Sequence, residues 1–120
     1  MYHRMEIWFA DLGYHHNRCI QNGPRPVLIL SNDISNSTAP FVVAAPMTSK
    51  THKLYLPTHV LVEPDDIEQD TWTANRPGSV LIEQITVVDK KQLLDCIGRV
   101  KAKAKKDEIN RAVRDFLELG

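Results

Sequence analysis

The stretch SVLIEQITVVD, residues 79–89, decides the fold class because it is the most strongly β-like part of the sequence. It is rich in valine and isoleucine, whose branched side chains favour extended backbone. Five shorter runs resemble it, and turns rich in proline, asparagine, aspartate or glycine separate them. The sequence therefore predicts six strands, at residues 5–11, 26–32, 41–47, 59–62, 79–89 and 95–100.

The C-terminal segment has helical periodicity instead. Its apolar residues recur on one predicted helix face, which is made of Ile109, Ala112, Val113, Phe116 and Leu117. Asp107 is predicted as the N-cap and Glu108 suits the first turn, with the lysine-rich residues 100–108 as a solvated lead-in. Strands do not alternate with helices, so we predict a mainly β fold: a small, strongly bent antiparallel sheet, barrel-like, covered by one C-terminal helix.

Composition narrows the class of protein. The chain has 120 residues, and we expect a single domain over residues 1–120. Its formal net charge of zero argues against wholesale binding of polyanions, although a local basic groove remains compatible with it. The sequence contains neither a secretion-signal pattern nor an apolar run near membrane-spanning length, so we expect a soluble, cytoplasmic protein.

Motifs for metals and nucleotide cofactors are missing from the sequence. Cys19 and Cys96 lie far apart and neither forms a C-x-x-C pair, so both are expected to be reduced thiols. His52 and His59 are isolated and are interpreted as surface residues. Because P-loop, dinucleotide-fingerprint and nucleophile-elbow motifs are also missing, we expect neither a metal nor a cofactor.

Three segments could carry chemistry. The connection GYHHNRCIQNGP, residues 13–24, is long for a hairpin loop and offers side chains that stack on bases or bond to base edges; the alternative is a surface loop without a role. The strand end PMTSK, residues 46–50, offers hydroxyls and a lysine, although a threonine there is often only a turn former. Glu83 and Gln84 interrupt an apolar strand, and structural pairing of Glu83 is the alternative to a functional role.

Arg25 is unusual because Pro24 and Pro26 flank it at the start of an apolar run. Prolines restrict the backbone, so the guanidinium is held where it stands. A guanidinium is permanently charged and matches the geometry of a phosphate. This placement favours a site for an anionic group.

Five motifs, in order, resemble the MazF/PemK (Kid) family of toxin endoribonucleases over nearly the whole chain. They are RMEIWFADLG (4–13), QNGPRPVLILSND (21–33), APMTSK (45–50), LPTHV (56–60) and SVLIEQITVVDK (79–90). The resemblance implies an SH3-like barrel of the plasmid-maintenance toxin type with a C-terminal helix. It also implies a homodimer that holds RNA in a groove along the dimer face and is blocked there by a cognate MazE-type antitoxin.

The resemblance implies cleavage of single-stranded RNA at short sequences, independently of metal and ribosome. The 2′-hydroxyl attacks the adjacent phosphate and leaves a 2′,3′-cyclic phosphate and a 5′-hydroxyl. The family's catalytic pair falls on Arg25 and Thr48, and we expect both to stabilise charge on the phosphate. The RNA-binding residues that the resemblance implies are Gln21, Gly23, Leu56, Pro57 and Gln84.

The chain departs from the family pattern at several positions. Ile20 and Thr86 replace common charged residues, and Met5 stands where glycine is common. His15 and His16 are unusual, and they are candidates for auxiliary proton transfer or for loop surface and RNA stacking. Two alternatives to the nuclease remain open: a non-catalytic, CcdB-like protein-binding toxin, and a degenerate, weakly active family member.

Overall fold

The computed structural model of the protein describes residues 1–14, 21–50, 56–69 and 78–120. Its strands are β1 (Glu6–Asp11), β2 (Pro24–Ile29), β3 (Phe41–Thr48), β4 (His59–Val62), β5 (Ile67–Gln69), β6 (Gly78–Leu81), β7 (Thr86–Asp89) and β8 (Leu93–Val100). Its α-helices are α1 (Asp33–Thr38) and α2 (Lys103–Phe116), and its 3-10 turns are η1 (Pro64–Asp66), η2 (Ile82–Gln84) and η3 (Lys90–Gln92). No helix in these ranges is long and apolar enough to cross a membrane.

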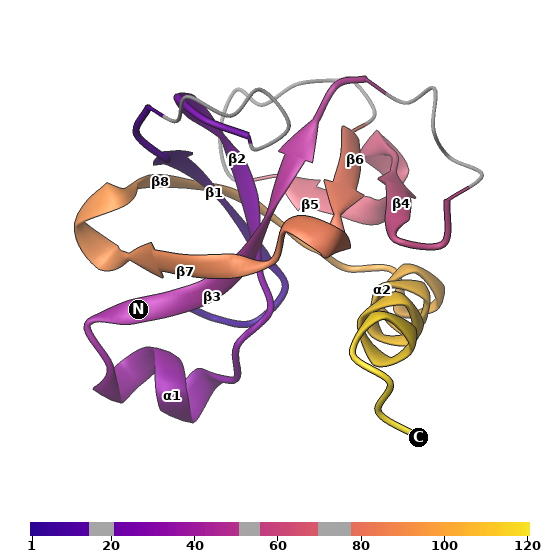
Figure 1. Ribbon diagram of the computed structural model, residues 1–120. Coiled ribbons are helices and arrows are strands. Elements are labelled where there is room, and N and C mark those ends of the chain that lie inside the picture. Colours follow the sequence, from indigo (N-terminus) through magenta and orange to yellow (C-terminus); the bar gives the residue numbers. More distant parts are fainter. Residues whose placement is uncertain (15–20, 51–55, 70–77) are drawn as a thin grey trace.

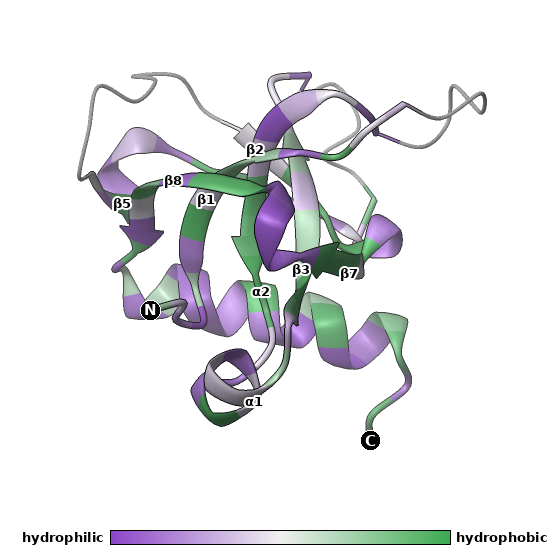
Figure 2. Ribbon diagram, turned by 90° about the vertical axis from the view of Figure 1, so that its left-hand side faces the viewer, coloured by the Kyte–Doolittle hydropathy of each residue, from purple (hydrophilic) through white to green (hydrophobic). Residues whose placement is uncertain are grey.

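The strands form one strongly bent antiparallel sheet that curls into a nearly closed barrel (Figure 1). Neighbouring strands follow the order β4-β6-β3-β2-β1-β8-β5, and β7 pairs with β3. Helix α2 lies across one side of this barrel, and Figure 2 shows polar and apolar bands along it. The predicted fold class is confirmed, and α1 and β5 are additions that the sequence pattern did not predict.

The sheet buries apolar side chains in two clusters. The larger cluster lies between the sheet and α2, and it includes Leu28, Met47, Val80, Ile82 and Ile109. The smaller cluster, on the alternate residues of the central strands, is made of Ala10, Val27, Ile29, Val42, Ala44, Val88 and Leu93. Because side chains alternate along a strand, the central strands contribute to both clusters.

The predicted single strand at 79–89 is wrong, because a 3-10 turn divides it into β6 and β7. Met47, at the end of β3, lies opposite Val80 of β6. Phe41, at the start of β3, lies opposite Asp89 of β7. The two registers differ by three residues, and the three residues of η2 absorb this difference. Residues 79–89 therefore pair with both ends of β3, through β6 at its C-terminal end and through β7 at its N-terminal end.

Helix α2 begins earlier than predicted. Its N-cap is Ala102, so the predicted N-cap Asp107 and the predicted solvated lead-in at 100–108 are wrong. Lysine and alanine are good helix formers, and Lys103 Nζ pairs with Asp107 one turn later at 2.9 Å. The apolar pattern starts only at Ile109, because a polar contact holds the first turns instead: Lys105 Nζ lies 4.0 Å from Asp66 Oδ2, and the lysine side chain is only 16% exposed. The pattern therefore marked the apolar part of the helix and missed its start.

The predicted apolar face of α2 is only partly covered. Ile109 and Ala112 are buried, and Val113 packs against the core. Phe116 and Leu117 remain 41% and 47% exposed. The last turn of the helix therefore extends past the sheet.

Strand β2 begins at Pro24, two residues before the predicted start, so Arg25 lies inside the strand. Arg25 pairs with Ala10 in the β1–β2 register. The run 26–32 also ends earlier than predicted, because α1 begins at Asp33 with Asn32 as its N-cap. The predicted strand at 59–62 is confirmed as β4.

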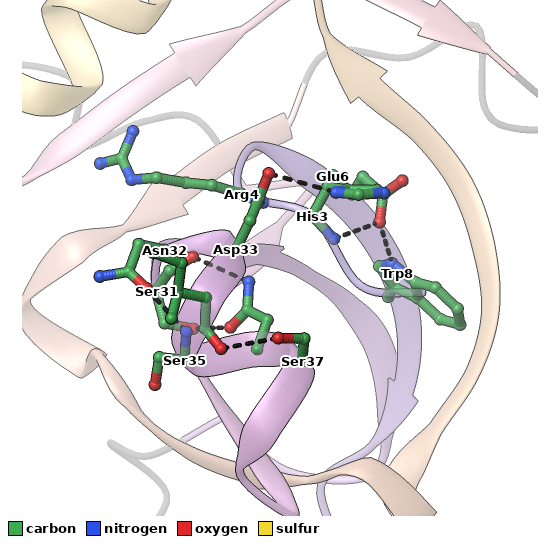
Figure 3. Close-up of polar contacts among 11 residues, drawn as sticks. His3, Arg4, Glu6, Trp8, Ser31, Asn32, Asp33, Ser35 and Ser37 are labelled. Atoms are coloured by element: carbon green, nitrogen blue, oxygen red, sulfur yellow. Dashed lines mark hydrogen bonds and ion pairs between the residues drawn. The ribbon is translucent and has the colours of Figure 1, made fainter.

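A dense polar network lies where α1 meets the N-terminal turn (Figure 3), and we call it the α1 network. The buried carboxylate of Glu6 accepts hydrogen bonds from the backbone N–H of His3 and from Trp8 Nε1, at 2.8 and 3.0 Å. Arg4 donates from Nε to the Leu30 carbonyl at 2.8 Å. Buried charged and polar groups are stable only when such partners are present.

The same network holds α1 through Asp33 and Asn36. Asp33 accepts a hydrogen bond from the Arg4 backbone N–H at 2.8 Å, and this bond is the main reason why its carboxyl pKa is lowered. Asn36 is fully buried, and its side-chain amide donates to the Ser31 carbonyl at 2.9 Å. Ser31 Oγ in turn donates to Asn36 Oδ1 and accepts from the Val43 N–H. The short helix is thereby tied to β2 and β3.

Met5, where the family commonly has glycine, adopts a φ of 72°. This left-handed conformation costs a residue with a side chain roughly 1 kcal/mol or more and costs glycine little. The methionine side chain is buried in the larger core cluster, which offsets that strain. Methionine in place of the family's glycine at position 5 therefore affects the stability of the fold beside the α1 network.

Candidate active site

Arg25 and Thr48 come from neighbouring strands, β2 and β3. The register of these strands pairs Val27 with Pro46. Extended by two residues toward the start of β2, the same register puts Arg25 opposite Thr48. Residues opposite each other on antiparallel strands share a face of the sheet. The fold therefore brings the two predicted catalytic residues to one edge of the barrel.

Backbone carbonyls hold the Arg25 side chain. Its Nε donates to the Asn22 carbonyl at 3.1 Å, and its Nη1 donates to the Met47 carbonyl at 3.4 Å. Among the described residues, no carboxylate forms an ion pair with Arg25. The guanidinium is thus oriented by neutral oxygens, and its charge is not cancelled by these residues.

Partial burial lowers the pKa of the Arg25 guanidinium from its ordinary value. Desolvation disfavours the charged form of any base, and here it is the cause of the shift. The ordinary pKa of arginine lies far above neutrality, so the group is still a cation at neutral pH. A partly desolvated cation attracts an anion more strongly than a fully hydrated one does.

Thr48 ends β3 and is half-buried. Its Oγ1 accepts a hydrogen bond from the Lys50 backbone N–H at 3.2 Å. This bond is the turn-forming contact that the sequence allowed. It also leaves the hydroxyl proton of Thr48 available to another acceptor, because a hydroxyl accepts and donates at once.

Two glycines close the base of the long first connection. The Gly23 N–H donates to the Gly13 carbonyl at 2.7 Å, and the Leu12 N–H donates to the Gly23 carbonyl at 3.0 Å. Gly13 and Gly23 have φ values of 75° and 70°, which only glycine adopts without strain. This closure leads the chain directly into β2, and so it sets the position of Arg25.

Gln21 and Gln84 meet although they are distant in sequence. The backbone N–H of Gln21 donates to Gln84 Oε1 at 2.9 Å. Glu83 and Gln84 lie in η2, the 3-10 turn that connects β6 to β7; their predicted place inside a strand is therefore wrong. Two of the predicted RNA-binding residues are thus joined.

Leu56 and Pro57 lie elsewhere. They precede β4 at the end where His59 pairs with Leu81, whereas Thr48 lies at the opposite end of β6. They line a groove of about 260 Å³ against α2, together with His59, Val60, Glu108, Arg111, Ala112 and Asp115. The structure therefore divides the predicted site residues between an edge at Arg25 and Thr48 and a groove beside α2.

His59 is not a surface residue as predicted, because its side chain is only 11% exposed. Its Nε2 contacts Glu83 Oε1, and Thr58 Oγ1 donates to Glu83 Oε2 at 3.0 Å. The structural pairing proposed as the alternative for Glu83 is thus present. It joins the segment before β4 to η2.

Some predicted residues lie outside the described ranges, namely Cys19, His15, His16, Ile20 and His52. Cys96 lies half-buried in β8, where its Sγ donates to the Gly98 carbonyl at 3.7 Å. In the described ranges no group of three or more histidine, cysteine or acidic residues is arranged to hold a metal ion.

Nearly the whole chain matches one known protein family. Residues 3–117 match the family described as the PemK-like, MazF-like toxin of type II toxin-antitoxin systems. The chain belongs to this family. This membership confirms the expectation drawn from the five sequence motifs.

Two curated relatives of this toxin are endoribonucleases. It is 34% identical to endoribonuclease EndoA of Bacillus subtilis, over 97% of this chain and 94% of that protein. It is 33% identical to endoribonuclease MazF of Staphylococcus saprophyticus, over 94% of this chain and 88% of that protein.

Solved structures agree with the fold of this toxin. A mycobacterial endoribonuclease in complex with its cognate antitoxin has a TM-score of 0.78 and 29% identity, covering all of this chain and 98% of that one. MazF from Deinococcus radiodurans has a TM-score of 0.73 over 97% and 96% of the two chains, and at 18% identity it supports the fold alone.

Two features of the site were not predicted from the sequence. The Met47 carbonyl orients Arg25. Because it is a backbone group, which every residue has, the residue types cannot predict this contact. The contact between His59 and Glu83 left a partial trace, because a carboxylate in an apolar run needs a partner. Only the pairing of β4 with β6 shows which residue that partner is.

Proposed function

We propose that this toxin is an endoribonuclease that cleaves single-stranded RNA, with Arg25 and Thr48 as its catalytic pair. One observation carries this proposal: Arg25 is held by two backbone carbonyls, opposite Thr48, without a carboxylate partner among the described residues. A cation beside a hydroxyl donor suits a phosphate whose negative charge increases during reaction. The endoribonuclease activity of both curated relatives supports the same chemistry.

The proposed reaction is an internal transfer at phosphorus. The ribose 2′-hydroxyl gives up its proton as its oxygen attacks the adjacent phosphorus, the bond from phosphorus to the 5′-oxygen breaks, and the leaving 5′-oxygen takes up a proton. The products are a 2′,3′-cyclic phosphate and a 5′-hydroxyl end. Because the nucleophile belongs to the RNA itself, the reaction requires no metal-bound water, and we propose that it is independent of metal and ribosome.

Arg25 and Thr48 act by stabilising charge in this scheme. The guanidinium neutralises the phosphate oxygens, and the Thr48 hydroxyl donates a hydrogen bond to one of them. A group with a pKa above about 12 is a poor base at neutral pH, so we do not assign proton removal to Arg25. His15 and His16 are the auxiliary candidates for that step, since histidine titrates near neutral pH.

Five further residues are proposed to contact the RNA. Gln21, Gly23 and Gln84 adjoin the catalytic edge, where amide groups can bond to base edges and glycine allows close approach of the backbone. Leu56 and Pro57 border the groove beside α2 and offer apolar contact to a more distant nucleotide.

We propose that this toxin acts as a homodimer of single domains, residues 1–120, in the cytoplasm. A cognate MazE-type antitoxin is the proposed inhibitor, and the antitoxin complex of the mycobacterial relative supports this assignment.

Cleavage of a long single-stranded RNA in EDTA tests the proposal, with wild type compared with Arg25→Ala and the product ends mapped. We expect discrete cuts with 5′-hydroxyl ends for wild type. Loss of one charge-stabilising donor reduces such rates by roughly 10²–10³, so the variant should be almost inactive.

Absence of cuts by folded wild type at high concentration would overturn the proposal and favour a CcdB-like, protein-binding toxin. Slow cleavage with the expected ends would instead identify a weakly active member, to which the replacements at Ile20 and Thr86 could contribute.

A further inference from the structure

Ser79 has an unusual environment for a polar residue. Its side chain is 1% exposed, and its Oγ has no hydrogen-bond partner within the part of the chain that the structure describes. Burying a hydroxyl without a partner is unfavourable, and folded proteins rarely tolerate it without a functional or structural reason. The position of Ser79 in the sheet suggests a functional reason.

Ser79 lies directly opposite Thr48 in the β3–β6 ladder. Residues paired in this way point to the same face, with Cβ atoms about 4.5–5.5 Å apart, and serine–threonine hydrogen bonds are among the pairs that form there. Beside Ser79, a Cβ at Gly78 would lie 3.2 Å from Met47 Cε, so the Met47 side chain packs closely against this part of β6. The unpartnered hydroxyl thus belongs to the residue that β6 pairs directly with the proposed catalytic Thr48.

We propose that Ser79 is a positioning residue for Thr48, an inference that rests on the proposed function. A hydroxyl accepts two hydrogen bonds and donates one. Thr48 Oγ1 already accepts from the Lys50 N–H. When RNA binds, rotation of the Ser79 side chain brings its hydroxyl to Thr48 Oγ1 as the second donor. With both acceptor positions filled, the Thr48 proton points to the scissile phosphate.

This role predicts effects of opposite sign on stability and on rate. Ser79→Ala removes a buried, unpartnered hydroxyl, so the free protein should become more stable and melt at a higher temperature. The same change should lower kcat about three- to tenfold, the usual effect of losing one neutral hydrogen bond, and leave KM unchanged. A residue with a purely structural role would not combine these results.

Ser31 provides a matched control, because its hydroxyl already bonds to Asn36 and to the Val43 N–H far from Thr48. Ser31→Ala should lower the melting temperature and leave kcat per folded molecule unchanged. Ser79→Thr retains the donor and should restore kcat.

A double-mutant cycle gives the decisive measurement, with single-turnover rates on a short RNA that contains one mapped cut. Wild type, Ser79→Ala, Thr48→Ala and the double variant are compared. We expect Ser79→Ala to have no further effect when Thr48 is absent. An unchanged rate for Ser79→Ala in the wild-type background, or the same loss in both backgrounds, would overturn the role of Ser79. Failure of wild type to cut would overturn the proposed function instead.

Discussion

The two ends of the β2–β3 pair use polar residues in opposite ways. At one end, in the α1 network, the fully buried Asn36 and its neighbour Ser31 bond to each other and to backbone groups (Figure 3). At the other end, Arg25 rests on two carbonyls, and the hydroxyl of Ser79 has no partner among the described residues. The two ends belong to the same strands. They differ in how many of their polar groups have hydrogen-bond partners.

This difference separates stability from function. A satisfied buried network stabilises one arrangement of the chain, whereas under-satisfied polar groups in a half-buried site retain interaction energy for a ligand. The residues with positive φ follow the same division. Gly23 adopts its conformation at little cost beside the proposed site, while Met5 adopts it with a buried side chain at the α1 network.

The largest expected effect comes from replacing one arginine at each end. Arg25→Ala should reduce RNA cleavage by roughly 10²–10³ and change the free energy of unfolding by less than about 1 kcal/mol, because the two hydrogen bonds that it removes are long, at 3.1 and 3.4 Å. Arg4→Ala should leave the rate per folded molecule unchanged. It should lower stability by about 1–3 kcal/mol, because Arg4 makes two short hydrogen bonds, at 2.8 Å to the Leu30 carbonyl and at 2.7 Å to Asn110 Oδ1.

Cleavage kinetics and urea unfolding of the two arginine variants provide the measurements. If Arg4→Ala abolished cleavage while remaining folded, or if Arg25→Ala unfolded the protein, the contrast between the two ends would be wrong.

An effect smaller than the loss of cleavage in Arg25→Ala is expected from Asn36→Ala. The change removes the amide that bonds to the Ser31 carbonyl and leaves buried groups unpaired, so stability should fall by about 2–3 kcal/mol. Thermal unfolding measures the loss, and kcat at a temperature where the variant is folded should match wild type. Unchanged stability would mean that the network is not a main source of stability.

The smallest effect is expected from Asp33→Asn, and it depends on pH. Hydrogen bonds from Arg4 and His3 lower the pKa of the Asp33 carboxyl in the folded protein. A lowered pKa stabilises the fold above the unfolded value of about 3.9, and this contribution is lost as pH falls through the folded pKa. The variant should therefore melt slightly below wild type at neutral pH, and the difference should vanish in acid.

Melting curves of both proteins from neutral pH into acid provide the check. A difference that persists or grows in acid would show that the Asp33 charge does not act through these bonds.

The sequence by itself determined the β-rich class, the C-terminal helix, the place of β4 and the candidacy of Arg25 and Thr48. Each of these depends on side-chain preferences over a few residues or on short motifs, which are local properties. The start of α2 was missed because its first turns contact the rest of the protein through a lysine, Lys105, so no apolar pattern marked them.

Only the tertiary structure decided how the parts meet. The division of residues 79–89 by η2, the pairing of Glu83 with His59 and the meeting of Gln21 with Gln84 all depend on strand registers. A register is set by contacts between segments distant along the chain, and a shift of one residue would turn every side chain to the other face. The same non-local choice put Arg25, Thr48 and Ser79 side by side.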